Sequence, residues 1–294
     1  MQRTAAILFF VFLAPPWLAG ARASELTERV LKVPVKLEDM YRKVIEREIT
    51  VTVFAESGRA PYPLLVLSHG RAPDSAGRKN LGRARYSEAS KHFASLGYSV
   101  WIPTRIGYGV SGTDMDPEDS GACGSKLYPP GYAAATEQVL QVMAYAKHLP
   151  EIDGTRIVSV GQSFGGATSI ALAARNPAGL VAAVNFAGGG GGDPRTRPGE
   201  PCEPFGLALM FGGYGKSARI PTLWIYAEND RYFAPRHVKS WYEAFRSQGG
   251  RGELILLPPF GDDGHLFFTR GLAVWQPIVE RFLLELVPPA VKAQ

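Results

Sequence analysis

The chain has 294 residues, a formal net charge of +5 and a hydrophobic content of 46%. That length is enough to bury a sizeable core, and the absence of repeats or a Pro/Ser-rich linker favours one large domain over two small ones. The charge excess is small and its basic residues are mostly scattered. Neither aromatic platforms nor a known binding motif accompany them, so we expect no nucleic-acid binding.

The first 23 residues resemble a secretory signal sequence. Arg3 supplies a positive charge, residues 5–13 form an apolar run too short to span a bilayer, and a small-x-small cleavage site ends at Ala23. We therefore expect a mature domain over residues 24–294 that is secreted or periplasmic, with no stable membrane insertion after cleavage. An uncleaved anchor or a lipoprotein is the alternative, although no cysteine lies near the cut.

Hydrophobic patterning predicts strands that alternate with helices from residue 64 onward. The segment 44–54 alternates in polarity, which is typical of a strand in an antiparallel edge pair, whereas the short continuous apolar runs are typical of buried parallel strands. The expected strands lie at 44–54, 64–67, 98–102, 156–160, 180–186, 222–226 and 253–257. The expected helices lie at 87–96, 136–149, 167–175, 238–248 and 274–286. This order predicts an α/β fold, with a mostly parallel doubly wound sheet and helices on both faces.

The pentapeptide Gly-Gln-Ser-Phe-Gly at 161–165 lies between an expected strand and an expected helix. A strand that turns abruptly into a helix holds Ser163 in a strained position at the tip of the turn, and small neighbours let the two elements approach. The helix N-terminus then favours negative charge that develops beside the serine. Ser163 is therefore the candidate nucleophile. The alternative is that these glycines serve only tight helix–sheet packing.

A serine hydroxyl needs a base within hydrogen-bond reach and an acid that orients the base. In this architecture the acid and then the histidine follow the serine along the chain. His265 lies in a loop directly after the last expected strand, whereas His237 begins a helix and is expected at the surface. We therefore predict His265 as the base. Asp230 follows the preceding strand and is the predicted acid, with Glu228 in reserve; a turn-forming role is the alternative for Asp230.

Backbone N–H groups are expected to bind the oxyanion of the reaction. One donor should be Phe164, the residue after the serine, and the other should come from the loop after the strand at 64–67. We place the second donor at Arg71, with Gly70 as the second choice. For His69 we prefer a structural role, in which it braces this loop, to a catalytic one.

Two further features of the expected loops concern the pocket. In an oxidising compartment, Cys123 and Cys202 should form one disulfide that staples two active-site loops; two free thiols are the alternative. The five glycines at 188–192 follow a strand, but no Lys-Ser/Thr signature follows them. We interpret this run as a flexible rim of the substrate pocket rather than a phosphate-binding loop.

Several blocks of the chain resemble the α/β-hydrolase superfamily, and more closely its dienelactone hydrolase-like branch. They lie in the family's order at 64–70, 97–109, 161–166, 227–230 and 264–265. Dienelactone hydrolase itself carries a cysteine nucleophile, whereas this chain has Ser163. The resemblance therefore does not imply lactone ring opening, and a serine at this position is more similar to a carboxylesterase or a related acyl hydrolase.

Together these features lead us to expect a serine hydrolase that cleaves small-molecule carboxylic esters through an acyl-enzyme. No metal or organic cofactor is expected, since no metal-ligand cluster is apparent in the sequence. A serine peptidase of the prolyl-oligopeptidase-like type shares this skeleton and is one alternative, although the sequence contains no propeller or other gating domain. A catalytically inactive hydrolase-fold binding protein is the other alternative. The acyl and alcohol groups and the oligomeric state are left open.

Overall fold

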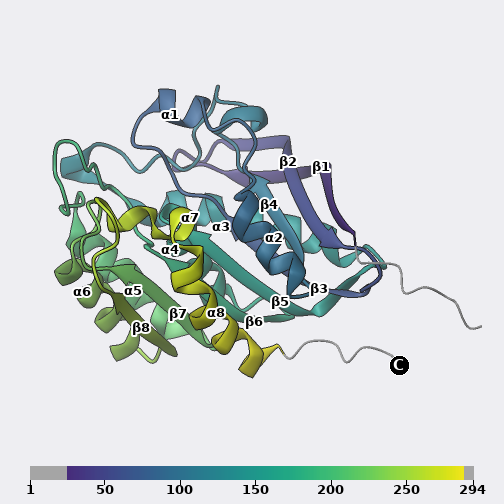
Figure 1. Ribbon diagram of the computed structural model, residues 1–294. Coiled ribbons are helices and arrows are strands. Elements are labelled where there is room, and N and C mark those ends of the chain that lie inside the picture. Colours follow the sequence, from purple (N-terminus) through teal and green to yellow (C-terminus); the bar gives the residue numbers. More distant parts are fainter. Residues whose placement is uncertain (1–24, 288–294) are drawn as a thin grey trace, which may run out of the picture.

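The computed structural model describes residues 25–287, so the expected signal sequence and its cleavage site lie outside the described residues. Within them, one eight-stranded sheet has the order β1-β2-β4-β3-β5-β6-β7-β8 (Figure 1). The strands are β1 (Leu26–Glu38), β2 (Val44–Glu56), β3 (Tyr62–Ser68), β4 (Ser99–Thr104), β5 (Ile152–Gln162), β6 (Leu180–Phe186), β7 (Thr222–Ala227) and β8 (Gly252–Leu257). Strands β1, β2 and β4 pair antiparallel in succession, and all other neighbours are parallel. The predicted fold class is confirmed.

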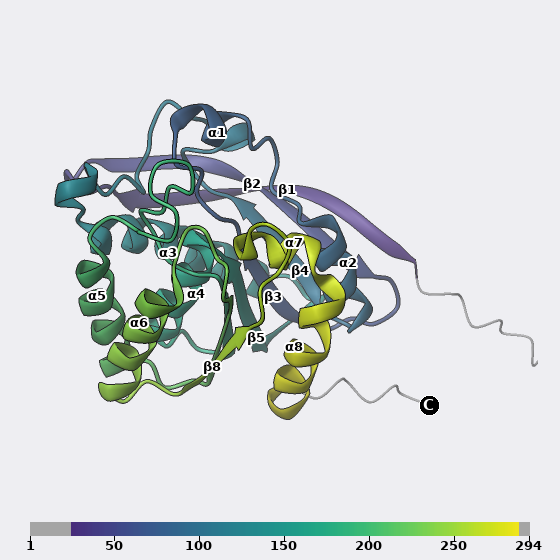
Figure 2. The ribbon, with the colours of Figure 1, turned by 60° about the vertical axis from the view of Figure 1, so that its left-hand side comes forward.

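Helices cover both faces of the sheet. They are α1 (Ser75–Lys79), α2 (Ser87–Ser95), α3 (Tyr128–Lys147), α4 (Phe164–Arg175), α5 (Pro204–Ser217), α6 (Pro235–Ser247), α7 (Phe267–Arg270) and α8 (Leu272–Leu286). Figure 2 shows α3, α4, α5 and α6 on one face and α2 and α8 on the other. Because both faces are covered, every residue of β3, β4 and β7 is buried, which explains their continuous apolar runs. None of the described helices is long and apolar enough to cross a membrane.

The segment at 44–54 has two antiparallel partners, β4 and the edge strand β1, and β1 was not predicted from the sequence. Its residues Val33, Val35 and Leu37 point into the core, and the residues between them are exposed. On the open side of this edge strand, Gln141 of α3 accepts a hydrogen bond from the Lys36 N–H (2.8 Å) and donates one to the Lys36 carbonyl (2.6 Å). A helix side chain thus satisfies backbone groups that an edge strand would otherwise leave unpaired.

Candidate active site

Ser163 occupies a sharp turn between β5 and α4. Its backbone has φ 57° and ψ −125°, a strained conformation for a residue with a side chain, and the residue is only 7% exposed. The glycines on either side are needed for close packing. A Cβ at Gly161 would clash with the carbonyl of Gly165, and a Cβ at Gly165 would clash with the carbonyl of Ser68. The strained strand–turn–helix that the pentapeptide predicts is therefore present, with Ser163 at its tip.

Asp230 and His265 form a buried pair beyond the ends of β7 and β8. The imidazole Nδ1 lies 2.9 Å from Asp230 Oδ2 and 3.1 Å from Oδ1, and each residue is 4% exposed. Asp230 Oδ1 also accepts hydrogen bonds from the backbone N–H groups of Tyr232 (2.7 Å) and Phe233 (3.0 Å). Because a carboxylate can only accept, the Nδ1 of His265 must carry the proton, which leaves Nε2 as an acceptor.

The loop that carries His265 is fixed by neighbouring polar groups. Asp263 Oδ1 accepts hydrogen bonds from the backbone N–H groups of His265 (3.0 Å) and Arg231 (3.1 Å). Asn229 accepts one from the Phe260 N–H (2.8 Å) and donates one to the Gly261 carbonyl (2.9 Å). The loops after β7 and β8 are therefore held together, so that Asp230 and His265 keep one relative position.

Aromatic rings enclose the imidazole of His265. Tyr232 stacks on it with a centroid distance of 4.0 Å and an interplanar angle of 22°, and Phe233 meets it edge-on at 5.4 Å. These two residues were not predicted from the sequence. Their position two and three residues after Asp230, where the same loop must fold back on the histidine, is the signal that could have identified them.

The reserve candidates lie elsewhere. Glu228 is exposed, and in the described part of the chain no hydrogen bond links its side chain to His265. His237 is half-buried rather than exposed, and its Nε2 lies 2.9 Å from a carboxylate oxygen of Glu200. The structure thus brings Asp230, and not Glu228, to the predicted base.

The two expected oxyanion donors both line the pocket that contains Ser163. Phe164 is the first residue of α4, so its N–H has no partner within that helix. Arg71 follows β3, and among residues 25–287 its N–H has no hydrogen-bond acceptor. By contrast, the Gly70 N–H donates to the hydroxyl of Tyr86 at 3.2 Å. The geometry therefore favours Arg71 over Gly70 as the second donor.

The pocket beside Ser163 has a volume of about 420 Å³. Its wall carries cations, carboxylates and aromatic rings. These side chains are Arg71, Arg78, Lys126, Arg197, Asp116, Asp119, Asp193, Tyr128, Phe164, Tyr232 and Phe233. Residues 25–287 contain no group of three or more histidine, cysteine or acidic side chains placed to hold a metal ion.

A disulfide joins Cys123 to Cys202, which confirms the predicted pairing. The two cysteines also line the pocket. Cys202 is buried and its N–H donates to the carbonyl of Gly191 at 2.9 Å, whereas Cys123 lies in an exposed turn. The bridge therefore ties an exposed loop of the wall to the glycine run.

The structure indicates a different reason for the presence of glycine at 188–192 from the flexibility that was expected. Gly189 to Gly192 line the pocket, as predicted, but aromatic rings pack directly on their backbone. A Cβ at Gly189 would lie 2.9 Å from atoms of Phe233 and Trp241, and one at Gly190 would lie 2.9 Å from Tyr128. Glycine is thus required here by close packing, and the interpretation as a rim made flexible by glycine is corrected accordingly.

Comparisons with known proteins concern the fold and the family of the chain. The model of the "Dienelactone hydrolase family" matches residues 72–274. No curated protein matches the sequence significantly. A putative dienelactone hydrolase from Klebsiella pneumoniae has a TM-score of 0.57 at 14% identity, over 86% of this chain and 98% of that one. An acetyl xylan esterase from Paenibacillus sp. R4 has a TM-score of 0.58 at 17% identity, over 90% of both chains.

A third structure resembles the chain over only part of its own length. The acylaminoacyl peptidase from Pyrococcus horikoshii has a TM-score of 0.61 at 15% identity, over 92% of this chain but 43% of the peptidase. At such identities the likeness to solved structures establishes the α/β-hydrolase fold alone. The family model covers more than half of the sequence, and the chain belongs to the dienelactone hydrolase family.

Proposed function

We propose that the protein is a serine hydrolase that cleaves carboxylic esters, with Ser163 as nucleophile, His265 as base and Asp230 as acid. The observation that carries the proposal is the buried Asp230–His265 hydrogen bond at 2.9 Å, on loops beyond the same sheet edge as the strained Ser163. Membership of a hydrolase family supports the reaction class. The pocket volume of about 420 Å³ suits a small-molecule ester.

In the proposed reaction, Nε2 of His265 takes the hydroxyl proton as Ser163 Oγ attacks the ester carbonyl carbon. The carbonyl oxygen becomes an oxyanion, which the N–H groups of Phe164 and Arg71 bind. The intermediate collapses, the C–O bond to the alcohol breaks, and His265 protonates the departing alcohol. Water then attacks the acyl-enzyme while His265 accepts its proton, the acid leaves, and His265 returns the proton to Ser163. Throughout, Asp230 keeps Nδ1 protonated and stabilises the imidazolium.

The test uses the purified protein with a p-nitrophenyl acyl ester, an aminoacyl-anilide and a fluorophosphonate probe. We expect turnover of the ester, little turnover of the anilide, and stoichiometric labelling that disappears in the Ser163→Ala variant. Ser247→Ala, at an exposed position at the end of α6, is the matched control and should label normally. Undiminished labelling of Ser163→Ala would remove this serine from the mechanism, and faster anilide than ester turnover would identify a peptidase instead.

We infer further that residues 1–23 direct export and are then removed. A disulfide between Cys123 and Cys202 supports an oxidising compartment, because such bridges are rare where thiols are kept reduced. Fractionation of the expressing cells and N-terminal sequencing of the protein should find it outside the cytoplasm, beginning at residue 24. Full-length protein in the cytoplasmic fraction would contradict this inference.

A further inference from the structure

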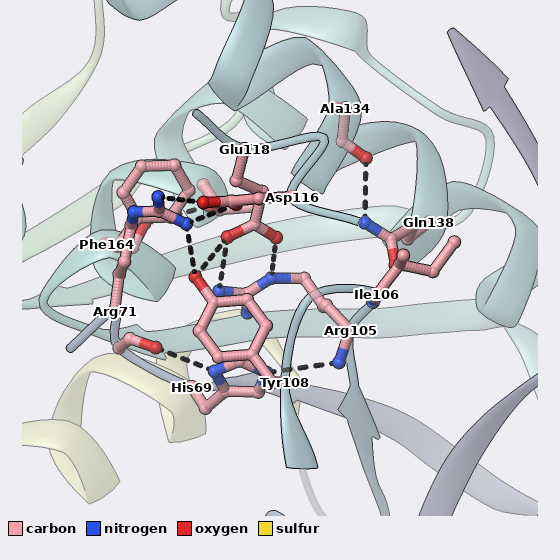
Figure 3. A network of polar contacts seen from close by, with 12 residues as sticks. His69, Arg71, Arg105, Ile106, Tyr108, Asp116, Glu118, Ala134, Gln138 and Phe164 are labelled. Atoms are coloured by element: carbon pink, nitrogen blue, oxygen red, sulfur yellow. Dashed lines mark hydrogen bonds and ion pairs between the residues drawn. The ribbon is translucent and has the colours of Figure 1, made fainter. Parts of the chain in front are cut away.

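A fully buried ion pair lies beside the loop after β3 that carries His69 and Arg71 (Figure 3). Arg105 follows β4 directly, and Glu118 lies in the irregular segment after it; both side chains are 0% exposed. The Arg105 Nε donates to Glu118 Oε1 at 2.5 Å, and Nη2 donates to Oε2 at 3.3 Å. Desolvating two charges is costly, and a buried ion pair is often no more stabilising than apolar side chains of similar volume. Its place next to the catalytic loops therefore points to a positioning role.

One side-chain path leads from this pair to Arg71. The hydroxyl of Tyr108, which is 1% exposed, donates to Glu118 Oε2 at 2.6 Å and accepts from Arg71 Nη1 at 3.1 Å. The guanidinium of Arg71 also donates to both carboxylate oxygens of Asp116, at 2.7 and 2.6 Å. A planar guanidinium held on two sides has little freedom to turn, so the side chain of Arg71 is fixed.

A backbone path leads from Arg105 to the same residue. The Arg105 N–H donates to His69 Nε2 at 3.1 Å, so the proton of this imidazole lies on Nδ1, which donates to the Gly70 carbonyl at 2.7 Å. Burial, together with the charge of Arg105, lowers the pKa of His69 and preserves this neutral form. The Gly70 carbonyl and the Arg71 N–H belong to one planar trans peptide and point in opposite directions. Holding the carbonyl therefore aims the N–H.

Arg105 also contacts the residue that supplies the other donor. Its guanidinium lies over the Phe164 ring, 5.8 Å from the centroid, in a cation–π arrangement. The same ring stacks on Tyr132 with a centroid distance of 4.1 Å and an interplanar angle of 11°. The Arg105 guanidinium is thus linked to both sides of the oxyanion site. It contacts the ring of Phe164 directly, and it is connected to Arg71 through Glu118 and Tyr108.

We propose that Arg105, Glu118 and Tyr108 are positioning residues and that His69 is a fourth. Together they hold the N–H groups of Phe164 and Arg71 in place for the oxyanion. This inference rests on the proposed ester hydrolysis. Donors that are fixed before the reaction stabilise the oxyanion without reorganising, and a small displacement of such groups lowers the rate strongly. The network should therefore affect the transition state more than the bound substrate.

The first test is Tyr108→Phe, which removes the hydroxyl between Glu118 and Arg71 but keeps the ring that packs on His69 at 4.5 Å. We expect kcat for a p-nitrophenyl ester to fall roughly 10- to 100-fold, less than the roughly 10²–10³-fold effect of deleting a donor outright, with KM changed by less than about twofold. Affinity for a trifluoromethyl ketone, which forms an oxyanion on the serine, should fall by a similar factor.

Tyr62→Phe is the matched control. Tyr62 is also buried, and its hydroxyl donates to the Glu56 carbonyl at 2.6 Å. It is the first residue of β3, however, and so lies at the opposite end of this strand from the pocket. This variant should keep the wild-type kcat and ketone affinity. An equal decrease of both quantities in the two variants would reduce the effect to general destabilisation and overturn the proposal.

A second pair of variants decides the matter if Tyr108→Phe does not fold. The amide of His69→Asn can donate to the Gly70 carbonyl in place of Nδ1, whereas His69→Ala cannot. The first should therefore retain at least about tenfold more kcat than the second, at similar KM. The positioning role alone would be overturned if His69→Asn and His69→Ala had equal kcat and equal ketone affinity. It would also be overturned if Tyr108→Phe kept the wild-type kcat and ketone affinity and only its melting temperature decreased. A wild-type protein that neither turns over esters nor binds the ketone would overturn the proposed function and this inference with it.

Discussion

Asp230 holds the Nδ1 of His265 at 2.9 Å while two backbone N–H groups, of Tyr232 and Phe233, hold Asp230 itself. Asp230 is thus oriented by its own loop, and the direction of the imidazole follows from it. Glu228, two residues earlier on the same loop, is exposed and makes no such contact within the described chain. The difference between these two acidic residues gives the first prediction.

Asp230→Asn should lower kcat by on the order of 10⁴-fold, because an asparagine can donate to Nδ1 and so favours the wrong tautomer of His265. Glu228→Gln makes the same change of charge at the exposed neighbour and should leave kcat within about twofold of wild type. Steady-state ester hydrolysis and melting temperature would be measured for both. A severe effect of Glu228→Gln with a mild effect of Asp230→Asn would transfer the acid role to Glu228.

Reduction of the Cys123–Cys202 bridge should lower thermal stability. The two cysteines are 79 residues apart, and closing so long a loop restricts the unfolded chain by roughly 3–5 kcal/mol. For a domain of this size we expect a decrease in melting temperature on the order of 10 °C. Calorimetry of oxidised protein and of the Cys123→Ser/Cys202→Ser variant tests this, with intact mass after alkylation as the control for the redox state. Equal melting temperatures would show that packing alone holds these loops.

Acidic pH should destabilise the fold partly through the protonation of His69. Burial and the charge of Arg105 place its folded pKa well below the ordinary value of 6.5, so below pH 6.5 the unfolded chain binds a proton that the folded chain does not. Stability from this group is fully present above pH 6.5 and is lost as the pH falls, with a slope of up to about 1.4 kcal/mol per pH unit. His69→Asn should therefore show a shallower decrease of unfolding free energy between pH 7 and 5, measured by urea titration. Curves that stay parallel over this range would contradict the prediction.

Gly190→Ala should narrow the pocket and strain its wall. The added Cβ would lie 2.9 Å from Tyr128 and 3.0 Å from the hydroxyl of Tyr132, which implies overpacking of roughly 1–3 kcal/mol and a lower kcat/KM. Gly213→Ala in α5 is the matched control, since among the described residues no atom outside the neighbouring backbone of its own helix lies within 4 Å of its added Cβ. That change should stabilise the helix by about 0.5–1 kcal/mol. Denaturant titration and ester kinetics of both variants provide the comparison, and a wild-type stability of Gly190→Ala would argue against tight packing of the run.

The buried parallel strands could be predicted because continuous apolar runs arise wherever helices cover both faces of a sheet. Strand β1 was missed because charged residues and Pro34 interrupt its pattern, and proline disfavours a strand assignment except at a sheet edge, where β1 in fact lies. Helix α3 begins at Tyr128 rather than at residue 136, since its two prolines occupy the first turn, where no N–H is needed. Helix α5 has several glycines and no consistent polar face, so only its packing reveals it.

The residues of the candidate site likewise differ in whether they could be predicted from the sequence. The positions of Ser163, Asp230 and His265 could be predicted because the architecture fixes their order along the chain and the strand ends on which they lie. The contacts of Glu118 could not, because this residue comes from an irregular segment without periodicity. Its role depends on meeting Arg105 and Tyr108 in the folded protein, which no local pattern encodes.

The disulfide has a topological consequence. The ring that it closes, from Cys123 to Cys202, includes Ser163, whereas Asp230 and His265 lie beyond it. A protease that cut the partly exposed turn at residues 176–179 would separate the chain into one piece with Ser163 and another with Asp230 and His265. The bridge would still join the two pieces, so that a nicked molecule keeps all three residues covalently connected until it is reduced.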